Sequence, residues 1–492
     1  MKELPRKLNR RTAETTAREK ATKRQIQASS PAEATQTRGE KTGLSDEKLE
    51  ALDKAHLWHP FTHMEQYIAD DPLIIVRGEG VRLFDTRGRA YYDGTSSIWL
   101  NVHGHRVPEL NRALTEQLGQ VAHSTLLGMS NVPAILLAEK LAKIAPRGLT
   151  RVFYVDNGAG AVEAAIKIAV QFWANQGAPT KHLVLGFHNN YHGDTLGAVG
   201  VSPDEMFHWP FTALLPPHPR VPYPYPYRSA APDPLAESLQ AAEEILRRRR
   251  DEIAAVIVEP VEGAGGIIVP PRGFLRGLRR LCDEYGALLI VDEVATGFGR
   301  TGPMFACHGE DVAPDLLCLG KGLSGGYLPI GATLATEKIF EAFLGEVDSG
   351  RTFFHGHSYA GNPLAAAVSL ANLELLEKLL PRLPEKIEAL SAWIFPLAEE
   401  PFVGDVRQAG FMVGIELVKD RATKEGFAYR DQVGWRVAHA ARERGLLVRP
   451  IGNVLIFMPP LASTLEELQE MSHILCEAFR ATRDDLAALA KG

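Results

Sequence analysis

The chain has 492 residues, of which 45% are hydrophobic and 23% charged, and its 54 Lys and Arg against 60 Asp and Glu give a net charge of −6. This composition is typical of a globular protein, and the charge balance excludes a general surface for nucleic acid or an anionic membrane. No apolar run approaches the ~20 residues of a membrane span, no apolar signal region opens the chain, and the four cysteines are widely spaced, so we expect a protein of the reducing cytoplasm without a membrane or nucleic-acid partner.

Residues 1–43 form a basic segment that differs from the rest of the chain. It carries 11 Lys and Arg against five Glu, a charge of +6, so the remaining residues carry −12. Large apolar side chains are scarce there, and such a segment cannot bury enough apolar surface to offset the entropy of ordering. We predict a disordered tail. A transit peptide, which the acidic residues disfavour, and a nucleic-acid-binding arm are the alternatives.

From Arg151 onward, short apolar runs alternate with amphipathic stretches. The predicted strands are Val152–Val155, Leu183–Phe187, Ala254–Val258, Ala287–Val291 and Leu316–Leu319, and the predicted helices between them include Ala161–Trp173 and Arg272–Tyr285. This alternation predicts an α/β fold with a mostly parallel sheet that is covered by helices on both faces. The proline-rich residues 216–234 predict a long irregular loop.

A second, smaller α+β domain is predicted after residue 378. Its predicted elements are the helix Glu385–Ile394 and the strands Phe411–Leu417 and Val454–Met458. The expected organisation is therefore a tail over residues 1–43, an N-terminal part of the small domain over 44–95, a large domain over 96–378, and the C-terminal small domain over 379–492.

Two chemically useful residues follow neighbouring predicted strands. Asp292 comes directly after Ala287–Val291, and Lys321 stands between two glycines after Leu316–Leu319, 29 residues further on. Ligands of such sheets bind at these strand ends. A lysine with a lowered pKa can hold a carbonyl cofactor as a Schiff base, and a carboxylate can keep a pyridine nitrogen protonated, so the pair points to pyridoxal phosphate. The structural alternatives are an Asp292 that caps a loop or pairs with Arg300, and a solvated loop lysine.

Two further features suit the same cofactor. The turn Asp156–Gly160 precedes a predicted helix, and free N–H groups at a helix N-terminus bind phosphate. Tyr191 follows the strand Leu183–Phe187 and could cover the cofactor ring. An ordinary strand-to-helix turn and an ordinary packing tyrosine are the alternatives. The sequence predicts no metal site.

The stretch 289–302, Leu-Ile-Val-Asp-Glu-Val-Ala-Thr-Gly-Phe-Gly-Arg-Thr-Gly, followed by Gly320-Lys321, resembles the signature of class III pyridoxal phosphate aminotransferases of fold type I. The resemblance extends over about residues 50 to 480. It implies a large domain that binds pyridoxal phosphate, with Lys321 as the Schiff-base lysine, Asp292 as the pyridinium partner, Tyr191 as the stacking residue, and Gly158 and Ala159 on the phosphate-binding turn.

Within the class, residues 57–62, 96–105 and 354–359 are most similar to the branch that converts 8-amino-7-oxononanoate to 7,8-diaminononanoate in biotin synthesis. The resemblance implies a homodimer with shared active sites. In it, Gly356, His357 and Ser358 belong to a loop that reaches the partner's site, where Ser358 donates to the phosphate and Gly356 faces substrate. Arg449 corresponds to the arginine that binds the substrate carboxylate. Asp194 contacts the acceptor's amine or, alternatively, caps the following segment.

Several positions depart from the pattern of this branch. Ala159 replaces a common serine, and the segment Glu259–Gly266 is one residue shorter than usual. Members that use S-adenosylmethionine carry Tyr, Trp and Tyr at the positions of Phe61, Ile98 and Ile456, so aromatic contacts to the donor are fewer here. The expected donor is S-adenosylmethionine, with lysine as the rival. The alternatives for the whole chain are a class III transaminase for ornithine, 4-aminobutyrate or β-alanine-type amines, and a noncatalytic protein that binds the cofactor or, through its tail, nucleic acid.

Overall fold

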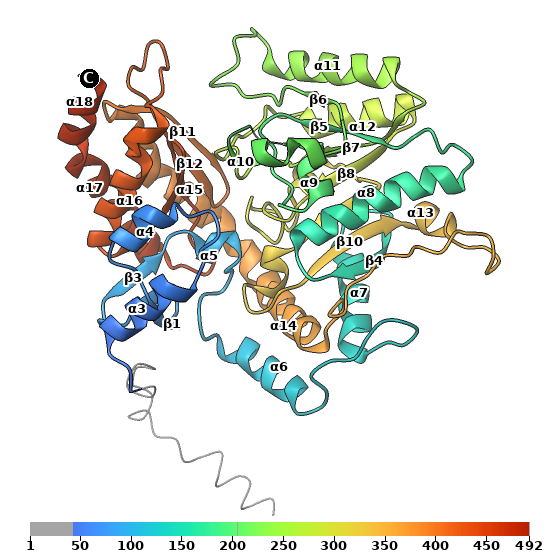
Figure 1. Cartoon of the computed structure of the whole chain (residues 1–492), viewed down its shortest axis with the longest axis horizontal. Helices are drawn as coiled ribbons and strands as arrows, with labels where there is room; N and C mark the ends of the chain where they lie inside the picture. The colour runs from blue at the N-terminus through green and yellow to red at the C-terminus, as the bar shows by residue number, and fades with distance from the viewer. Residues whose placement is uncertain (1–42, 204, 492) are drawn as a thin grey trace, which may run out of the picture. The chain divides into compact units, whose positions relative to one another are not determined.

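The computed structural model describes residues 43–203 and 205–491 (Figure 1). The tail predicted over residues 1–43 lies outside these residues, except for Gly43. Contacts divide the described chain into two units, residues 43–77 with 84–89 and residues 78–83 with 90–491. The domain boundaries that we predict at residues 95 and 378 stay predictions.

The first unit contains two helices, α3 (Asp46–His56) and α4 (Met64–Ala69). Helix α3 begins at Ser45, whose hydroxyl accepts a hydrogen bond from the Lys48 N–H (3.3 Å). Asp53 of α3 accepts a hydrogen bond from the Tyr67 hydroxyl of α4 (2.6 Å), which joins the two helices. Phe61 lies in the segment between them, with 56% of its surface exposed.

The second unit is built on a seven-stranded sheet of order β4-β10-β9-β8-β7-β5-β6. Its strands are β4 (Leu149–Val155), β5 (Leu183–Phe187), β6 (Arg220–Val221), β7 (Ile253–Val258), β8 (Leu288–Asp292), β9 (Leu316–Leu319) and β10 (Gly331–Thr336). Strand β10 runs antiparallel to β4 and β9, and the pairs β9-β8, β8-β7, β7-β5 and β5-β6 are parallel. The predicted α/β fold with a mostly parallel sheet is confirmed.

Two segments differ from the prediction. Residues Gly331–Thr336 are mostly small and have no strong strand pattern. They nevertheless form β10, because they pair with β4 on one side and β9 on the other. The prediction of an irregular loop over residues 216–234 is wrong at Arg220–Val221, which pair with Gly186 and Phe187 of β5. In both segments the hydrogen bonds of neighbouring strands outweigh the local sequence signal.

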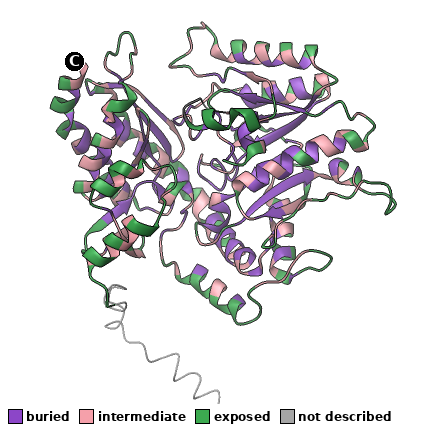
Figure 2. Ribbon diagram, in the orientation of Figure 1, coloured by how far each residue is buried: buried purple, intermediate pink, exposed green. Residues whose placement is uncertain are grey.

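Apolar cores lie on both faces of this sheet, because successive strand residues point to opposite sides. Figure 2 shows that the strands of the sheet are mostly buried. In β8, Ile290 packs in one core with residues of α8, and Leu289 and Val291 pack in the other with residues of α12. The helices that contribute to the first core are α8 (Gly158–Asn175), α9 (Leu196–Val201) and α13 (Glu337–Glu341). Those that contribute to the second include α7 (Val132–Ile144), α11 (Pro234–Arg248), α12 (Phe274–Tyr285) and α14 (Pro363–Leu379).

A second sheet of this unit has the order β11-β12-β15-β14. Its strands are β11 (Val403–Ala409), β12 (Met412–Leu417), β14 (Arg449–Ile451) and β15 (Val454–Phe457), and the helices after α14 are α15 (Leu383–Ile394), α16 (Val433–Glu443), α17 (Leu465–Ala481) and α18 (Arg483–Lys491). The remaining elements are β1 (Ile75–Glu79), β2 (Arg82–Asp85), β3 (Ala90–Asp93), α5 (Ser96–Trp99), α6 (Pro108–Leu118), α10 (Glu205–His208) and β13 (Leu446–Leu447), which pairs in parallel with β3. In the described part of the chain, no helix combines the length and apolar character of a membrane span.

Candidate active site

Lys321 follows Gly320 at the end of the buried strand β9 and has a left-handed φ of 40°. Its neighbour Gly320 packs on the start of α8, because a Cβ on Gly320 would lie 3.2 Å from the Gly158 Cα. The Lys321 Nζ lies 4.4 Å from the centre of the Trp99 ring. Burial lowers the pKa of Lys321 to about 8, although the nearby carboxylates of Glu259 and Asp292 raise it. At pH 7 about a tenth of this lysine is therefore neutral and nucleophilic, a far larger fraction than for an ordinary lysine.

Asp292 ends the neighbouring strand β8 and is 4% exposed. Its Oδ2 contacts the Nδ1 of His192 at 2.7 Å, and its Oδ1 accepts the Val294 N–H at 3.0 Å. The alternative of a pair with Arg300 is wrong, because the Arg300 guanidinium donates instead to the carbonyl groups of Pro459 and Asn101. The buried carboxylate is thus oriented by two neighbours at the strand end.

Glu259 is a third titratable residue at a strand end, directly after β7. Its carboxylate accepts the backbone N–H groups of Tyr191 (2.8 Å) and Gly263 (3.2 Å). Burial, with a further contribution from the Asp292 charge, raises the pKa of Glu259 to about 7. We did not predict Glu259 or His192, although the strand-end argument that selected Asp292 applies equally to Glu259.

The predicted phosphate-binding turn lies at the N-terminus of α8. Asn157 caps this helix by accepting the Gly160 N–H (2.8 Å). Gly158 leaves room for Val294, whose Cγ1 would be 2.5 Å from an added Cβ, and Gly193 leaves room for Ala159 in the same way (2.3 Å). The turn is therefore packed against the segments that follow Asp292 and Tyr191. Asn157 occupies the Gly160 N–H, and the Gly158 and Ala159 N–H groups lie before it at the helix N-terminus, where backbone N–H groups attract an anion.

Tyr191 and Asp194 lie together in the loop after β5. The Tyr191 hydroxyl donates to Asp194 Oδ2 (2.7 Å), and burial together with this carboxylate raises the pKa of Tyr191. Helix α9, which follows, has Thr195 as its N-cap residue without a side-chain cap. The alternative of Asp194 as a helix cap is therefore wrong, and its carboxylate positions the tyrosine hydroxyl.

The predicted intersubunit loop contains Gly356, His357 and Ser358. His357 Nδ1 lies 3.1 Å from the Asp156 carboxylate, next to the N-terminus of α8 in its own chain. Gly356 and Ser358 are exposed. The structure thus brings His357 to the predicted phosphate turn, and the roles of Gly356 and Ser358 stay predictions.

A strained turn carries Ile98. Ser96, Ser97, Ile98 and Trp99 all have left-handed φ values, of 49°, 48°, 67° and 70°. This conformation costs L-residues about 1–2 kcal/mol each and is exceptional for a β-branched side chain. Ile98 is 46% exposed, whereas Trp99 is 9% exposed and carries the ring beside Lys321. The turn therefore leaves the Ile98 side chain half-exposed and buries the Trp99 ring beside Lys321.

Arg449 begins β14, directly opposite Ile456 of β15. Burial lowers the pKa of Arg449, and its guanidinium carbon lies 5.8 Å from the centre of the Trp435 ring. Ile456 is 1% exposed and belongs to an apolar cluster with Trp99. Strand pairing and this cluster connect Arg449 with the turn beside Lys321. Phe61 belongs to the first unit, and its predicted role stays a prediction.

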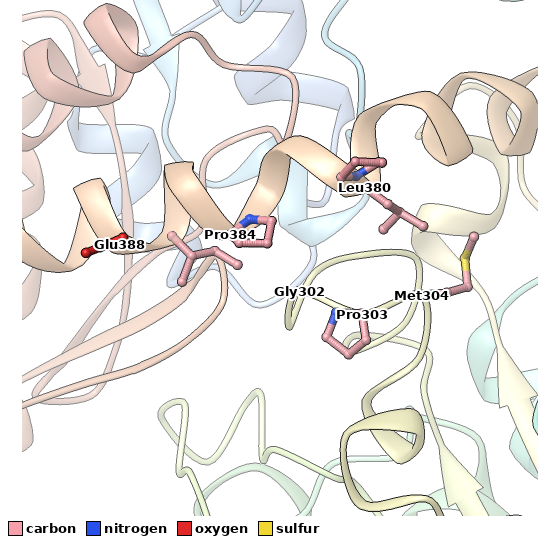
Figure 3. Close-up of a pocket in the computed structure, with 8 residues that line it drawn as sticks. Gly302, Pro303, Met304, Leu380, Pro384 and Glu388 are labelled. Carbon is pink, nitrogen blue, oxygen red and sulfur yellow. The ribbon is translucent and has the colours of Figure 1, made fainter.

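A pocket of about 680 Å³ lies elsewhere in the second unit (Figure 3). Its lining is mostly apolar: Gly302, Pro303, Met304, Leu380, Pro381, Pro384, Ile387 and Glu388. The predicted site residues are not among these, so this pocket is separate from the strand-end site.

Together, these groups fit pyridoxal phosphate. Lys321 offers an amine with a lowered pKa, Asp292 a buried carboxylate, and α8 an anion-binding N-terminus, all at one edge of the sheet. Among the described residues, the buried His192 Nε2 beside Asp292 has no hydrogen-bond partner, so this nitrogen is available for a hydrogen bond with a bound group. The fold and the site define a pyridoxal phosphate-dependent enzyme.

The comparisons with known proteins agree. Residues 66–479 match the family model "Aminotransferase class-III". The adenosylmethionine-8-amino-7-oxononanoate aminotransferase of Geobacter sulfurreducens is 49% identical over 85% of this chain and 94% of its own. The crystal structure of the enzyme of that name from Methanocaldococcus jannaschii has a TM-score of 0.86 at 43% identity, with 89% of this chain and 99% of the other covered. A Pseudomonas jessenii omega transaminase in complex with PMP has a TM-score of 0.85 at 31% identity, with 89% and 99% covered.

This chain belongs to the class III aminotransferase family. The prediction of an aminotransferase that uses pyridoxal phosphate is thereby confirmed.

Proposed function

We propose that this enzyme converts 8-amino-7-oxononanoate to 7,8-diaminononanoate in biotin biosynthesis. The observation that carries the proposal is the 49% identity, over 85% of this chain and 94% of the relative, to a protein named for this reaction. The site supports it, because Arg449 is a half-buried guanidinium on a strand that connects with the turn beside Lys321, as a substrate with a distant carboxylate requires.

Bound pyridoxal phosphate supplies an aldehyde that carries the amino group from donor to acceptor and a ring that accepts electrons. Lys321, when neutral, would move a proton from the donor carbon that bears the amino group to the cofactor in the first half-reaction. In the second half-reaction it would move a proton from the cofactor to the acceptor carbon that receives the amino group. Asp292 keeps a proton on the ring nitrogen, and the N-terminus of α8 holds the phosphate. Tyr191 covers the ring, and Asp194 orients the Tyr191 hydroxyl and contacts the acceptor's amine.

The active unit in this proposal is a cytoplasmic homodimer. Exposed apolar side chains gather in two segments, residues 123–132 and 354–361. These segments contact each other, because the rings of His123 and Tyr359 lie 5.0 Å apart and the Asn131 side chain donates to the Gly361 carbonyl (3.0 Å). The exposed apolar side chains of these segments are Leu127, Met129, Val132, Phe354 and Tyr359. A second copy would bury them and would bring Ser358 to the partner's phosphate. The cysteines, all within the described residues, are unpaired, as a reducing compartment requires.

Mixing inactive Ser358→Asp subunits with inactive Lys321→Ala subunits tests the shared site. A negative charge beside the phosphate should abolish binding in the first variant. A mixed dimer contains one site without either defect, so random exchange should restore about a quarter of the wild-type activity. No recovery after subunit exchange has been verified by mass would place Ser358 in its own subunit's site.

The donor is S-adenosylmethionine, as the relatives' names indicate, or lysine. Half-reactions decide between them: the visible absorbance of the cofactor-loaded enzyme is followed after each donor is added without acceptor. If S-adenosylmethionine is the donor, Ile98→Trp adds an aromatic face at a half-exposed position and should tighten its binding about fivefold. If lysine is the donor, the same substitution narrows the site and slows the reaction.

A general ω-transaminase is the competing function, because a structure of that class superposes with a TM-score of 0.85. The same half-reaction assay separates the two. Conversion by ornithine or 4-aminobutyrate, with no reaction from S-adenosylmethionine or lysine, would establish the competing function. Formation of 7,8-diaminononanoate from 8-amino-7-oxononanoate by the complete enzyme would establish the proposed one.

A further inference from the structure

The left-handed turn Ser96–Trp99 is held by a buried carboxylate just before it. Asp93, the last residue of β3, is 1% exposed. Its Oδ1 accepts the Ser97 N–H (2.8 Å), and its Oδ2 accepts the Ser97 hydroxyl (2.7 Å) and contacts His105 Nε2 (3.2 Å). Burial by itself raises the pKa of Asp93, but the contacts with His105 and Ser97 outweigh it and hold this pKa below its usual value. The carboxylate is therefore charged while it grips the turn.

Two more anchors hold the ends of the turn. The Ser96 hydroxyl donates to the Met458 carbonyl (2.6 Å), and Arg300 donates to the Asn101 carbonyl (3.2 Å). The Asn101 side chain contacts His105 Nδ1 (3.3 Å), so the same histidine connects Asp93 with the exit of the turn. The result is a closed ring of contacts around the left-handed backbone.

The turn determines where the Trp99 ring lies. Trp99 packs over Gly263, where its Cζ3 would be 2.8 Å from an added Cβ, and its ring faces the Lys321 Nζ. If the turn relaxed to the right-handed conformation that L-residues prefer, Trp99 and Ile98 would both point elsewhere. The contacts to Asp93 act against that relaxation, since they require the Ser97 N–H and hydroxyl to face the same carboxylate.

We propose that Asp93 and His105 are positioning residues, which hold Ser96–Trp99 in the left-handed conformation and thereby set the fit of the amine substrate beside Lys321. The proposal rests on the proposed function only for the identity of that amine. It assigns these residues no proton transfer and no contact with substrate. Their effect is exerted through Trp99 and Ile98.

Substitutions at Ser97 test the conformation itself. Glycine adopts positive φ without steric cost, whereas alanine does not, and both remove the hydroxyl. Ser97→Gly should therefore keep the apparent KM for the amine donor within about threefold of the wild-type value, and Ser97→Ala should raise it about tenfold. Equal KM values for the two variants would overturn the proposal, because loss of the hydroxyl affects both alike.

Asp93→Asn tests the hydrogen bonds between the Asp93 carboxylate and Ser97, with Asp85→Asn as the matched control. Asp85 is equally buried (1% exposed) and accepts backbone N–H groups of Arg87 (3.0 Å) and Arg89 (2.8 Å), but it belongs to the first unit. Asp93→Asn and His105→Ala should raise the donor KM about tenfold with a smaller change in kcat, and should speed amide hydrogen exchange over residues 96–101 of the holoenzyme. Asp85→Asn should lower the melting temperature without either change.

The outcomes separate this inference from the proposed function. The KM assays use whichever amine donor reacts with the cofactor of the wild-type enzyme, and the hydrogen-exchange measurement needs no amine. A wild type that converts neither S-adenosylmethionine nor lysine would end the proposed function, while the order of the Ser97 variants would still decide the inference. An Asp93→Asn enzyme that behaves like Asp85→Asn, with stability lowered but KM and local exchange unchanged, would make Asp93 purely structural.

Discussion

Two regions of different structure meet at Lys321: the strand ends of the large sheet and the left-handed turn Ser96–Trp99. The ends of β8 and β9 belong to a sheet in which parallel pairing joins Asp292 to Cys318 and neighbouring residues, with apolar cores on both faces. The turn Ser96–Trp99 has a strained backbone that depends on a few side-chain contacts, chiefly those of Asp93. The sheet positions its residues through many redundant contacts, so chemical substitutions there should change chemistry without moving the backbone. The turn has little redundancy, so small changes there should alter geometry.

The largest effect is expected for Lys321→Ala. Loss of the amine should slow the donor half-reaction by at least about a hundredfold and should prevent borohydride from fixing the cofactor to the chain. Lys181 is the control: it is 8% exposed, and burial also lowers its pKa, but its Nζ donates to the Ile253 and Gly286 carbonyls. Lys181→Ala should lose stability and keep cofactor fixation. Peptide mapping of the fixed cofactor to another lysine would contradict the strand-end site.

Asp292→Asn should follow, with transamination slowed about a hundredfold while the cofactor stays bound, since an amide does not keep the ring nitrogen protonated. Asp315 provides a comparison at the other end of β9, where its Oδ2 accepts the Leu289 N–H (2.8 Å) and the Arg279 guanidinium (2.8 Å). Asp315→Asn should reduce the melting temperature and leave single-turnover rates near those of the wild type. Near-normal turnover by Asp292→Asn would reduce this residue to a structural role.

Arg449→Ala should raise the apparent KM for 8-amino-7-oxononanoate about tenfold or more, because a charge-assisted pair with its carboxylate is lost. The donor half-reaction should change much less. Arg436, an exposed arginine whose Nε donates to the Asp431 carbonyl, is the control, and Arg436→Ala should leave both half-reactions unchanged. An equal effect of Arg449→Ala on acceptors that lack a carboxylate would show that Arg449 does not bind that group.

The smallest effect concerns the pH dependence of cofactor binding. It involves Arg300, which interacts with both regions. In the proposed function, the cofactor-free enzyme would capture pyridoxal phosphate with neutral Lys321, so the capture rate should rise with pH with a midpoint near the pKa of about 8. The Arg300 charge lowers this pKa, and Arg300 also donates to Asn101 after the turn. Arg300→Gln should therefore move the midpoint upward, whereas Arg300→Lys, which keeps the charge, should hold it. A midpoint near the ordinary lysine value of about 10.5 in the wild type would show that Lys321 is not desolvated.

Sequence patterns were sufficient to identify the site residues that lie at the ends of regular strands. Asp292 and Lys321 follow short apolar strands, and the class III signature around them selects pyridoxal phosphate, which the family match bears out. Sequence reasoning did not find β10, because its residues become a strand only through pairing with β4 and β9. It also missed the partner of Asp292, since His192 is 100 residues away in the chain.

The sequence by itself determined the α/β class, the family and the residue types at the strand ends, because periodic burial and signature motifs are local properties of the chain. Tertiary structure alone decided the electrostatics and the strained backbone. The pKa of Lys321 depends on burial and on the charges of Glu259, Asp292 and Arg300. The left-handed turn depends on Asp93, His105 and the distant Met458 carbonyl. These interactions join residues that are far apart in the chain, and so their strength is set by the folded geometry.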